Sequence, residues 1–368
     1  MPAGKELAAW LRLLLSPGIG RDTARALLAA HGGPEAVFDA PAELLREQLG
    51  RLASAVLREP DGLSEHVARS EAWLKGGPQR AVVALGEAHY PPLLLQTADP
   101  PLLLFLEGRA ELLSRPSIAI VGSRSATAQG LDNARRMAAE CSRRGYTVVS
   151  GLAAGIDGAA HEGGLAADGS TVAVVGTGLD RVYPASHHAL AQRIAAQGLL
   201  LSEFPLGTPP LAQNFPMRNR IIAGLSLGTL VVEAALRSGS LITARLAGEM
   251  GREVFAMPGS IHAQQARGCH ALIKQGAKLV ESIDDVLEEF TGHTPPVSPA
   301  RPDPPDEAAP PAPDPLLHAL GHDPVTLDTL VARTGWSAAE LNVRLLELEL
   351  DQQVSRLPGG LFQRLAHG

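Results

Sequence analysis

The stretch Ser117-Ile118-Ala119-Ile120-Val121-Gly122 decides the fold of this chain. Its five uncharged residues are typical of a strand that is buried on both faces, and the glycine ends that strand. Helical periodicity follows over residues 127–144, and a second strand candidate comes at residues 146–149. A strand, a helix and a second strand in this order predict two parallel strands joined by a right-handed crossover.

The same alternation continues through the middle of the chain. Further strand candidates are residues 171–175, 199–201, 228–232, 253–256 and 278–280, with helical stretches between nearly all of them. Two earlier apolar runs, residues 81–85 and 102–106, extend this sheet or form a small antiparallel addition. Residues 79–290 therefore predict an α/β domain with a Rossmann-like, doubly wound and mostly parallel sheet.

Helices dominate the predicted N-terminal domain, residues 1–78. Its segment Ser16-Pro17-Gly18-Ile19-Gly20 resembles the turn of a helix-hairpin-helix or SAM-like unit, in which the amides at the glycines can contact a DNA phosphate. Small helical interaction domains contain similar turns. The sequence therefore leaves two alternatives open, a DNA contact and a protein contact.

The C-terminal part of the chain predicts a linker and a third domain. Residues 291–315 are crowded with proline, which favours a semi-extended linker. Within residues 316–368, a short helix, a turn and a helix opening at Ser337 precede a hairpin with a Pro-Gly-Gly tip, a pattern that predicts a winged helix. The presumed recognition helix carries Glu340, Glu347 and Glu349, which argues against reading of duplex DNA and for contact with protein.

Composition limits the functions that are possible. The chain has 368 residues, a formal net charge of −7 and 45% hydrophobic residues. A general electrostatic attraction to nucleic acid is excluded, so any phosphate binding must be local. The two cysteines, Cys141 and Cys269, form no disulfide framework, and no residues have the spacing of a structural zinc site. We expect no metal, no cofactor, no membrane span and no secretory signal, hence a cytoplasmic protein.

Glycine-bearing loops follow three of the predicted strands. They are Gly122-Ser123-Arg124-Ser125, Gly151-Leu152-Ala153-Ala154-Gly155-Ile156-Asp157 and Gly176-Thr177-Gly178. Ligands of doubly wound sheets bind at these strand ends, where glycines let a backbone approach and helix-start amides bond an anion. The glycine spacing fits neither a dinucleotide fingerprint nor a Walker P-loop. The sequence therefore predicts an anion-lined surface at this edge.

A cluster of two arginines, Phe215-Pro216-Met217-Arg218-Asn219-Arg220, stands before the apolar run 221–225. A guanidinium fork matches phosphate oxygens two at a time, and the aromatic ring offers a face for base stacking. We expect Arg218 and Arg220 to grip a phosphate backbone. The alternative is that surface arginines solvate the start of a helix.

Three further polar residues could take part in catalysis, but we favour a structural role for each of them. Asp157 and His161 lie four residues apart on one helix, where they could pair as orienter and base. We favour a structural interpretation, in which Asp157 caps the helix and His161 packs against the sheet. Glu233 ends a strand and could act as an acid or base, although structural use is again favoured.

The run of motifs resembles the DprA family, also called Smf, the DNA-processing proteins of bacterial natural transformation. The strongest block is residues 215–226, and the others follow in chain order over most of the α/β domain. They are Val121-Gly122-Ser123-Arg124, residues 151–161, Gly178-Leu179-Asp180 with Tyr183-Pro184, residues 202–207, Val232-Glu233-Ala234, residues 238–244 and Ala256-Met257-Pro258-Gly259.

The resemblance implies a binding protein and not an enzyme. It implies that the Rossmann-like domain binds single-stranded DNA and forms a homodimer, and that the protein protects incoming DNA and loads RecA onto it. By motif position, Arg124 is a primary phosphate contact, Arg181 is a second one, and Arg218 and Arg220 complete the groove. The expected DNA-binding set is Gly122, Ser123, Arg124, Arg181, Phe215, Arg218, Asn219, Arg220 and Ser240.

One departure and one alternative accompany this resemblance. Where the family pattern has an asparagine, this chain has His270. The alternative is a nucleotide-processing enzyme, because phosphoribohydrolases with related domains use a Pro-Gly-Gly-x-Gly-Thr loop and a glutamate. Only the Gly228-Thr229 half of that loop and Glu233 are present here.

Overall fold

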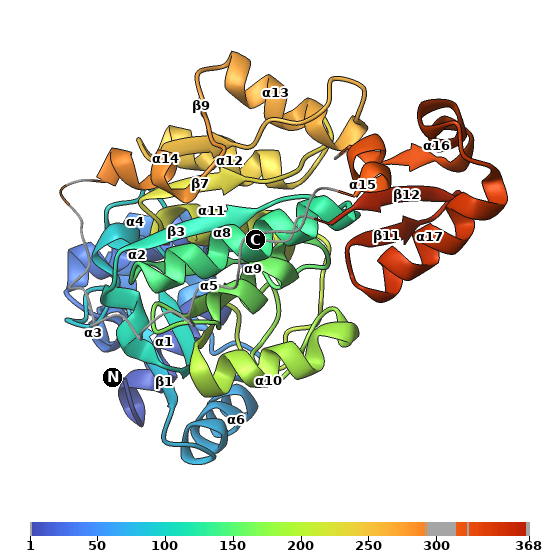
Figure 1. Cartoon of the computed structure of the whole chain (residues 1–368). Coiled ribbons are helices and arrows are strands. Elements are labelled where there is room, and N and C mark those ends of the chain that lie inside the picture. The colour runs from blue at the N-terminus through green and yellow to red at the C-terminus, as the bar shows by residue number, and fades with distance from the viewer. Residues whose placement is uncertain (1, 291, 293–313, 322–323, 366–368) are drawn as a thin grey trace.

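The computed structural model describes residues 2–290, 292, 314–321 and 324–365 (Figure 1). The predicted linker lies almost wholly outside the described residues. The proposed boundary at residue 78 falls between the last N-terminal helix and the first strand. The proposed boundary at residue 316 falls inside the first helix of the C-terminal domain.

A nine-stranded sheet forms the centre of the molecule, in the order β1-β2-β6-β5-β4-β3-β7-β8-β9. Seven strands are parallel: β3 (Ser117–Val121), β4 (Thr147–Ser150), β5 (Thr171–Val174), β6 (Leu199–Ser202), β7 (Gly228–Val231), β8 (Glu253–Ala256) and β9 (Lys278–Leu279). β1 (Arg80–Ala84) and β2 (Leu103–Gly108) continue the sheet antiparallel beyond β6. Successive strands build outward from β3 on both sides, which confirms the doubly wound prediction.

Helices cover both faces because the strands are apolar on both faces. On β3, Ile118 and Ile120 join one hydrophobic cluster while Ala119 and Val121 join another, as the period of two requires. The first cluster includes α8 (Ala128–Arg143), α9 (Ile156–Gly164) and α14 (Ile283–Leu287), and the second includes α7 (Pro92–Leu95), α11 (Asn214–Leu225), α12 (Ser240–Glu249) and α13 (Arg267–Lys274). α10 (His188–Gln197) packs on the third cluster, which continues into the N-terminal region.

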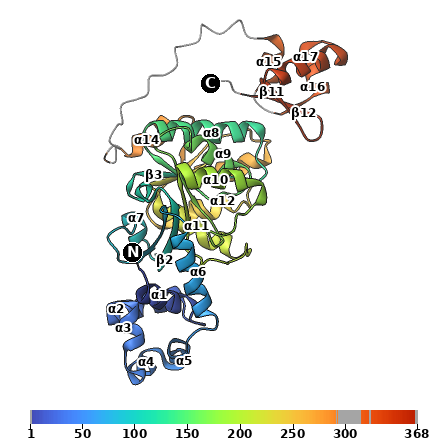
Figure 2. The same cartoon turned by 90° about the horizontal axis from the view of Figure 1, so that it is seen from below.

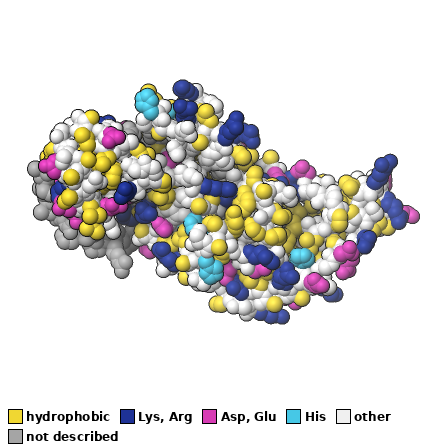
Figure 3. Space-filling model, turned by 90° about the vertical axis from the view of Figure 1, so that its right-hand side faces the viewer, with side chains coloured by type: hydrophobic (Ala, Val, Ile, Leu, Met, Phe, Trp, Pro, Cys, Tyr) yellow, Lys and Arg dark blue, Asp and Glu magenta, His cyan; other side chains and the backbone are white. Residues whose placement is uncertain are grey.

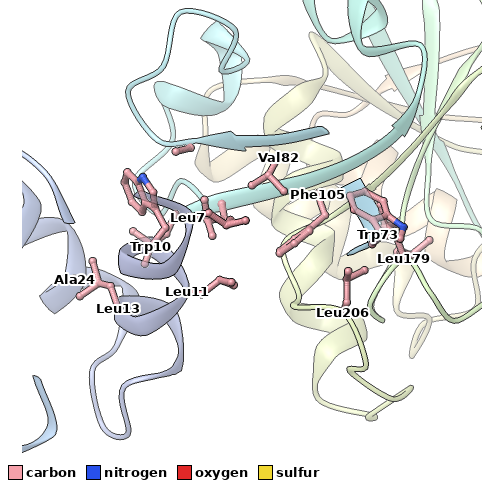
Figure 4. Close-up of a cluster of buried hydrophobic side chains, with 14 of the residues drawn as sticks. Leu7, Trp10, Leu11, Leu13, Ala24, Trp73, Val82, Phe105, Leu179 and Leu206 are labelled. Carbon is pink, nitrogen blue, oxygen red and sulfur yellow. The ribbon is translucent and has the colours of Figure 1, made fainter. Parts of the chain in front are cut away.

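The N-terminal helices share this third cluster with the sheet. They are α1 (Lys5–Leu15), α2 (Arg21–His31), α3 (Pro34–Asp39), α4 (Ala42–Leu49), α5 (Ala53–Leu57) and α6 (Leu63–Lys75). Figure 4 shows Leu7 and Leu11 on the side of α1 that faces Val82 and Phe105. Trp73 of α6 meets the Phe105 ring edge-on, with 6.2 Å between ring centroids. The helical region is therefore packed onto the antiparallel end of the sheet.

The N-terminal glycine turn faces the α/β domain. Ile19 and Gly20 line a cavity of about 440 Å³ together with Phe204, Pro205 and Met217. Part of this turn therefore lies close to the α/β domain, while the DNA contact and the protein contact both stay predictions.

The C-terminal domain has the predicted winged-helix order. It consists of α15 (Pro315–Leu320), β10 (Val325–Thr326), α16 (Leu327–Thr334), α17 (Ala338–Leu350), β11 (Val354–Leu357) and β12 (Leu361–Arg364). Ser337 caps α17 in a reciprocal capping box with Glu340. The buried Gln363 of β12 donates from Nε2 to Oε1 of Gln129, at 2.9 Å, on the first turn of α8. The domain therefore lies beside the start of α8, at the far end of the molecule from α1 (Figures 1 and 2).

Across the described ranges, no helix is both long enough and apolar enough to cross a membrane.

Candidate functional site

The three glycine-bearing loops meet at the carboxyl edge of the parallel strands. Gly155 has a φ of 78°, and a Cβ there would come within 2.2 Å of the Ser123 carbonyl oxygen. Only glycine permits this approach, which lets the Ile156 amide at the start of α9 donate to that oxygen at 3.1 Å. The loops after the neighbouring strands β3 and β4 are thereby locked together, next to the boundary between β3 and β7 where the strand order reverses.

Arg218 lies beneath these loops. Its side chain is inside the protein, with only 4% of the residue exposed. Nη1 donates to the carbonyl oxygens of Gly151, directly after β4, and of Val174, the last residue of β5. A Cβ on Gly151 would collide with the guanidinium at 2.2 Å, so the glycine makes room for it. Burial lowers the pKa of Arg218 to about 10, and the nearby carboxylate of Asp157 opposes that shift, so the group stays charged at neutral pH.

Arg220 is buried on a different side of α11, with 7% of the residue exposed. It forms an ion pair with Glu203, which follows β6, and its Nε lies 3.0 Å from Oδ2 of Asp99. Asp99 also pairs with Arg21 and Arg25 of α2. Arg220 thus belongs to an ion network that ties the N-terminal helices to the α/β domain.

The prediction that Arg218 and Arg220 form one wall of a phosphate groove is therefore wrong in its geometry. Residues two apart on an α-helix point about 200° away from each other, so the two guanidinium groups cannot share a wall. Both are also held by partners inside the protein. The alternative of solvating surface arginines is equally wrong, since neither is at the surface.

The exposed part of the edge is a rim made by Arg124, Phe215 and Tyr183. The Arg124 guanidinium lies 5.6 Å from the centroid of the Phe215 ring, and the Tyr183 ring lies 5.4 Å from the same ring. The Arg124 side chain has no hydrogen bond or ion pair within the part of the chain that the structure describes, and its contact there is with the Phe215 ring. One cation with unused donors thus sits beside two adjacent aromatic faces, a combination suited to an anionic ligand with flat rings.

Arg181 lies on the same loop as Tyr183, after β5, and its side chain is exposed. The Thr177 hydroxyl donates to the Arg181 carbonyl oxygen at 2.9 Å, which fixes the loop backbone. Tyr183, which belongs to the rim, was not among the candidate binding residues predicted from the sequence. Its place in the Tyr183-Pro184 motif was the available signal.

The remaining predicted site residues are supports within this edge. Asn219 Oδ1 accepts from Nε of Arg218 at 3.0 Å. Ser240 is buried at the first turn of α12, and its hydroxyl lies 2.7 Å from that of Ser238. Ser123 Oγ accepts from the Ser125 amide at 3.2 Å, while Gly122 packs against Ile156. Of these contacts, those of Ser123 and Gly122 belong to the loop that carries Arg124.

Asp157 and His161 both make structural contacts, but the prediction that Asp157 caps its helix is wrong, because the N-cap of α9 is Gly155 and no side chain caps that helix end. Asp157 Oδ2 accepts from the Gly151 amide at 3.1 Å, so its carboxylate ties down the loop that precedes its own helix. The amide of Leu152 donates to His161 Nε2, and His161 Nδ1 lies 2.8 Å from Thr171 Oγ1. Burial, followed by the charge of Arg218, lowers the pKa of His161 to about 3. This histidine is neutral at pH 7 and has both ring nitrogens engaged.

Glu233 anchors the start of α8. Its carboxylate accepts from the Thr127 amide at 3.0 Å and from the Thr127 hydroxyl at 2.5 Å. Thr127 is the N-cap of that helix, so Glu233 stabilises the turn that presents Arg124. His270, the departure from the family pattern, directs Nε2 to the Gly259 carbonyl oxygen at 3.0 Å.

Within the described ranges, no three His, Cys, Asp or Glu side chains are grouped so that they could hold a metal ion.

Comparison with known proteins identifies the family. Residues 81–291, more than half of the chain, match the family model described as DNA recombination-mediator protein A, and residues 299–360 match the DprA winged helix domain. The chain belongs to the DprA/Smf family. Protein Smf of Escherichia coli is 42% identical over 95% of this chain and 94% of its own length.

Two solved structures of the family resemble this one. DNA processing protein A from Streptococcus pneumoniae superposes with a TM-score of 0.65 at 37% identity, over 78% of this chain and 99% of its own. The Helicobacter pylori protein gives a TM-score of 0.52 at 30% identity, over 57% of this chain and 96% of its own. Its structure is described as showing a single-stranded DNA binding mode of DNA processing protein A.

Proposed function

We propose that this protein binds single-stranded DNA across the rim of Arg124, Phe215 and Tyr183. The observation that carries the proposal is the contact chain in which an exposed guanidinium lies over one aromatic ring and a second ring abuts the first. The guanidinium can bind phosphates, and the faces of the aromatic rings can stack with unpaired bases. The Helicobacter pylori relative, whose description names single-stranded DNA, supports the choice of ligand.

The preference for a single strand follows from stacking and from charge. Bases in a duplex are already stacked on their neighbours, so they cannot use the aromatic faces of the rim. The chain carries a net charge of −7, and in Figure 3 its Lys and Arg side chains lie in separate groups. Separate groups of basic side chains suit a flexible single strand, which can bend to contact each group. Arg181, after β5, is the proposed second phosphate contact.

The proposed biological role of this protein is in DNA recombination. We infer from family membership that the protein protects incoming DNA in the cytoplasm and loads RecA onto it during natural transformation. Binding, and not catalysis, is the proposed activity, because Glu233 and His161 are held by structural hydrogen bonds. The measurement is the DNA-dependent ATPase rate of RecA on a strand already coated with single-strand binding protein. Adding this protein is expected to shorten the lag.

A homodimer through the α/β domain is part of the same proposal. A groove of about 580 Å³ runs between α12 and α13 and is lined mainly by apolar side chains, including Leu241, Ile242 and Leu272. Leu236, which also lines this groove, is strongly exposed. A two-fold arrangement would let each copy place such side chains in the groove of the other. Leu236→Glu is expected to lower the mass measured by light scattering from dimer to monomer.

The test of the proposed activity is a direct binding measurement with a parallel enzyme assay. Anisotropy of a labelled oligothymidylate is compared with that of a duplex of equal length, over a range of salt concentrations. The protein is incubated separately with nucleoside monophosphates, and released base is measured. Tighter, salt-sensitive binding of the single strand without base release supports the proposal. Base release that is lost in Glu233→Gln would overturn it in favour of a nucleotide-processing enzyme.

A further inference from the structure

Helix α17 of the winged-helix domain exposes a stripe of aliphatic side chains that has no role in DNA binding. Val343 is 62% exposed, Leu346 58% and Leu350 76%. Together with the exposed Ala339, they recur at intervals of four, three and four residues, which places them on one face of the helix. The stripe spans three helical turns, about 16 Å at the rise of an α-helix.

The opposite face of the same helix already forms the core of the domain. Leu341, Leu345 and Leu348 are buried against α15, α16 and the wing. The exposed stripe is therefore not needed for the fold of the domain. Surface leucines at this spacing are typical of an amphipathic helix that binds a second helix or an apolar groove.

Carboxylates flank the stripe on both sides. Glu340 and Glu347 lie along one flank and Glu349 along the other, by the helical spacing of 100° per residue. Arg344 is the one basic residue of α17, and it is paired with Asp314 and Glu347. In Figure 3 the winged-helix domain lies at the left end, and hydrophobic side chains gather there among acidic ones. The surface thus combines an apolar centre with negative edges.

We propose that α17 is a docking site for an amphipathic helix of a partner protein, with aliphatic residues on one face and Lys or Arg on its flanks. Charge complementarity selects this occupant. DNA phosphates would meet Glu340, Glu347 and Glu349 in the position of the recognition helix, and like charges repel. A second copy of α17 would bring the same carboxylates together across the contact, which disfavours self-association.

The docking site and the proposed DNA rim are formed by different elements of the chain. The winged-helix domain contacts the α/β domain through Gln363 of β12 and Gln129 of α8, whereas the stripe on α17 remains exposed. A partner bound to α17 is then held on the domain that contacts the start of α8, the helix that follows the Arg124 loop. This inference concerns a different surface from the proposed DNA site, and its main test uses a peptide and no DNA.

The probe is a synthetic helix of about three heptads with Leu at the a and d positions and Lys at the e and g positions. Two control peptides accompany it: one has Glu in place of Lys, and the other has the same composition with the leucines shuffled out of register. Binding to the full-length protein is measured by fluorescence anisotropy. The in-register Lys peptide is expected to bind at least tenfold more tightly than either control.

Substitutions then locate the site. Leu346→Ser and Leu350→Ser are expected to weaken binding of the Lys peptide by tenfold or more. Leu95→Ser, which removes an exposed leucine from α7, is the matched control and leaves binding unchanged. Glu349→Lys is expected to reduce the preference for the Lys peptide over the Glu peptide. Circular dichroism melting of each variant checks that the domain remains folded.

Three outcomes would overturn the proposal. Equal binding of the in-register and shuffled peptides would mean that charge alone attracts them. A solution mass that falls on Leu346→Ser would assign the stripe to a second copy of this chain. Duplex DNA binding that is lost in Leu346→Ser or Leu350→Ser, but kept in Leu95→Ser, would assign α17 to nucleic acid.

Discussion

The arginines at the carboxyl edge of the sheet divide into two groups with opposite environments. Arg124 is exposed on a loop, lies over the ring of Phe215, and keeps its donors unused in the described part of the chain. Arg218 and Arg220 lie below it on α11, buried and bonded to carbonyl oxygens or carboxylates of the protein. The difference teaches that an arginine-rich motif at a ligand edge can serve the scaffold as much as the ligand.

The buried group explains how the exposed one is held. Arg218 joins the ends of β4 and β5, and Arg220 joins α11 to the N-terminal helices through Asp99. Phe215 sits one turn before Arg218 on the same helix, so fixing α11 also fixes the ring beside Arg124. Substitutions in the two groups should therefore separate stability from DNA affinity.

The largest expected effect comes from Arg218→Ala. It leaves the Gly151 and Val174 carbonyl oxygens without their donor, and it leaves the buried Asp157 without its nearby positive charge. Removing one partner of a buried charged group costs about 3–5 kcal/mol of folding free energy. Urea unfolding followed by circular dichroism measures this loss. Arg193→Ala, at an exposed arginine of α10, is the control and should change stability by less than about 0.5 kcal/mol. Equal effects of the two substitutions would contradict the buried role.

The second effect is a pH-dependent loss in Asp99→Asn. Burial opposes ionisation of Asp99, but the hydrogen bonds from Arg21 and Arg25 and the charge of Arg220 outweigh it and hold the pKa of the carboxyl below its usual range. A lowered carboxyl pKa adds stability above the unfolded-state value, about 3.9, and that stability is lost as pH falls through the folded-state value.

Thermal melting between pH 7 and pH 3 tests this expectation. Asp99→Asn should lose about 1–3 kcal/mol at pH 7, less than a fully buried pair because the Asp99 side chain is partly exposed. Its stability should also fall less than that of the wild type below about pH 4. Parallel pH curves for the two proteins would show that the ion network does not join the N-terminal helices to the sheet.

The third effect falls on DNA affinity with folding unchanged. Arg124→Ala is expected to weaken oligothymidylate binding about tenfold, the loss of one charge-assisted contact. The slope of log affinity against log salt should become shallower by about 0.7, the value for one phosphate on a single strand. Arg124→Lys should restore the slope but only part of the affinity, because an ammonium lacks the two-pronged fork. An unchanged slope in Arg124→Ala would remove this residue from the site.

The smallest effect is that of Phe215→Leu. Leucine keeps an apolar side chain against Gly176 but removes the ring face on which a base would stack. Affinity should drop about fivefold, within the range of about 1–3 kcal/mol for loss of one stacking partner. The salt slope should stay that of the wild type because no charge is lost. A change in slope without a change in affinity at low salt would contradict a stacking role.

The sheet could be predicted from the sequence because a strand that is buried on both faces is a short run of apolar residues, which can be recognised without knowing the rest of the fold. The strand at residues 117–121 was placed to the residue, and the helix capped by Ser337 began where expected. The environment of Arg218 and Arg220 could not be read in the same way. It depends on carboxylates and carbonyls that are distant in sequence, such as Asp99 and the end of β5, which only the folded chain brings together.

The account rests on the claim that the strand crosses the exposed rim and not the arginines of α11. Ultraviolet cross-linking of an oligothymidylate that carries 5-iodouracil, followed by mass spectrometry of the tryptic peptides, tests it most directly. The account predicts adducts at Phe215 or Tyr183 that are lost at high salt and reduced in Arg124→Ala. Adducts confined to the N-terminal helices or to the winged-helix domain, with none at this edge of the sheet, would contradict it.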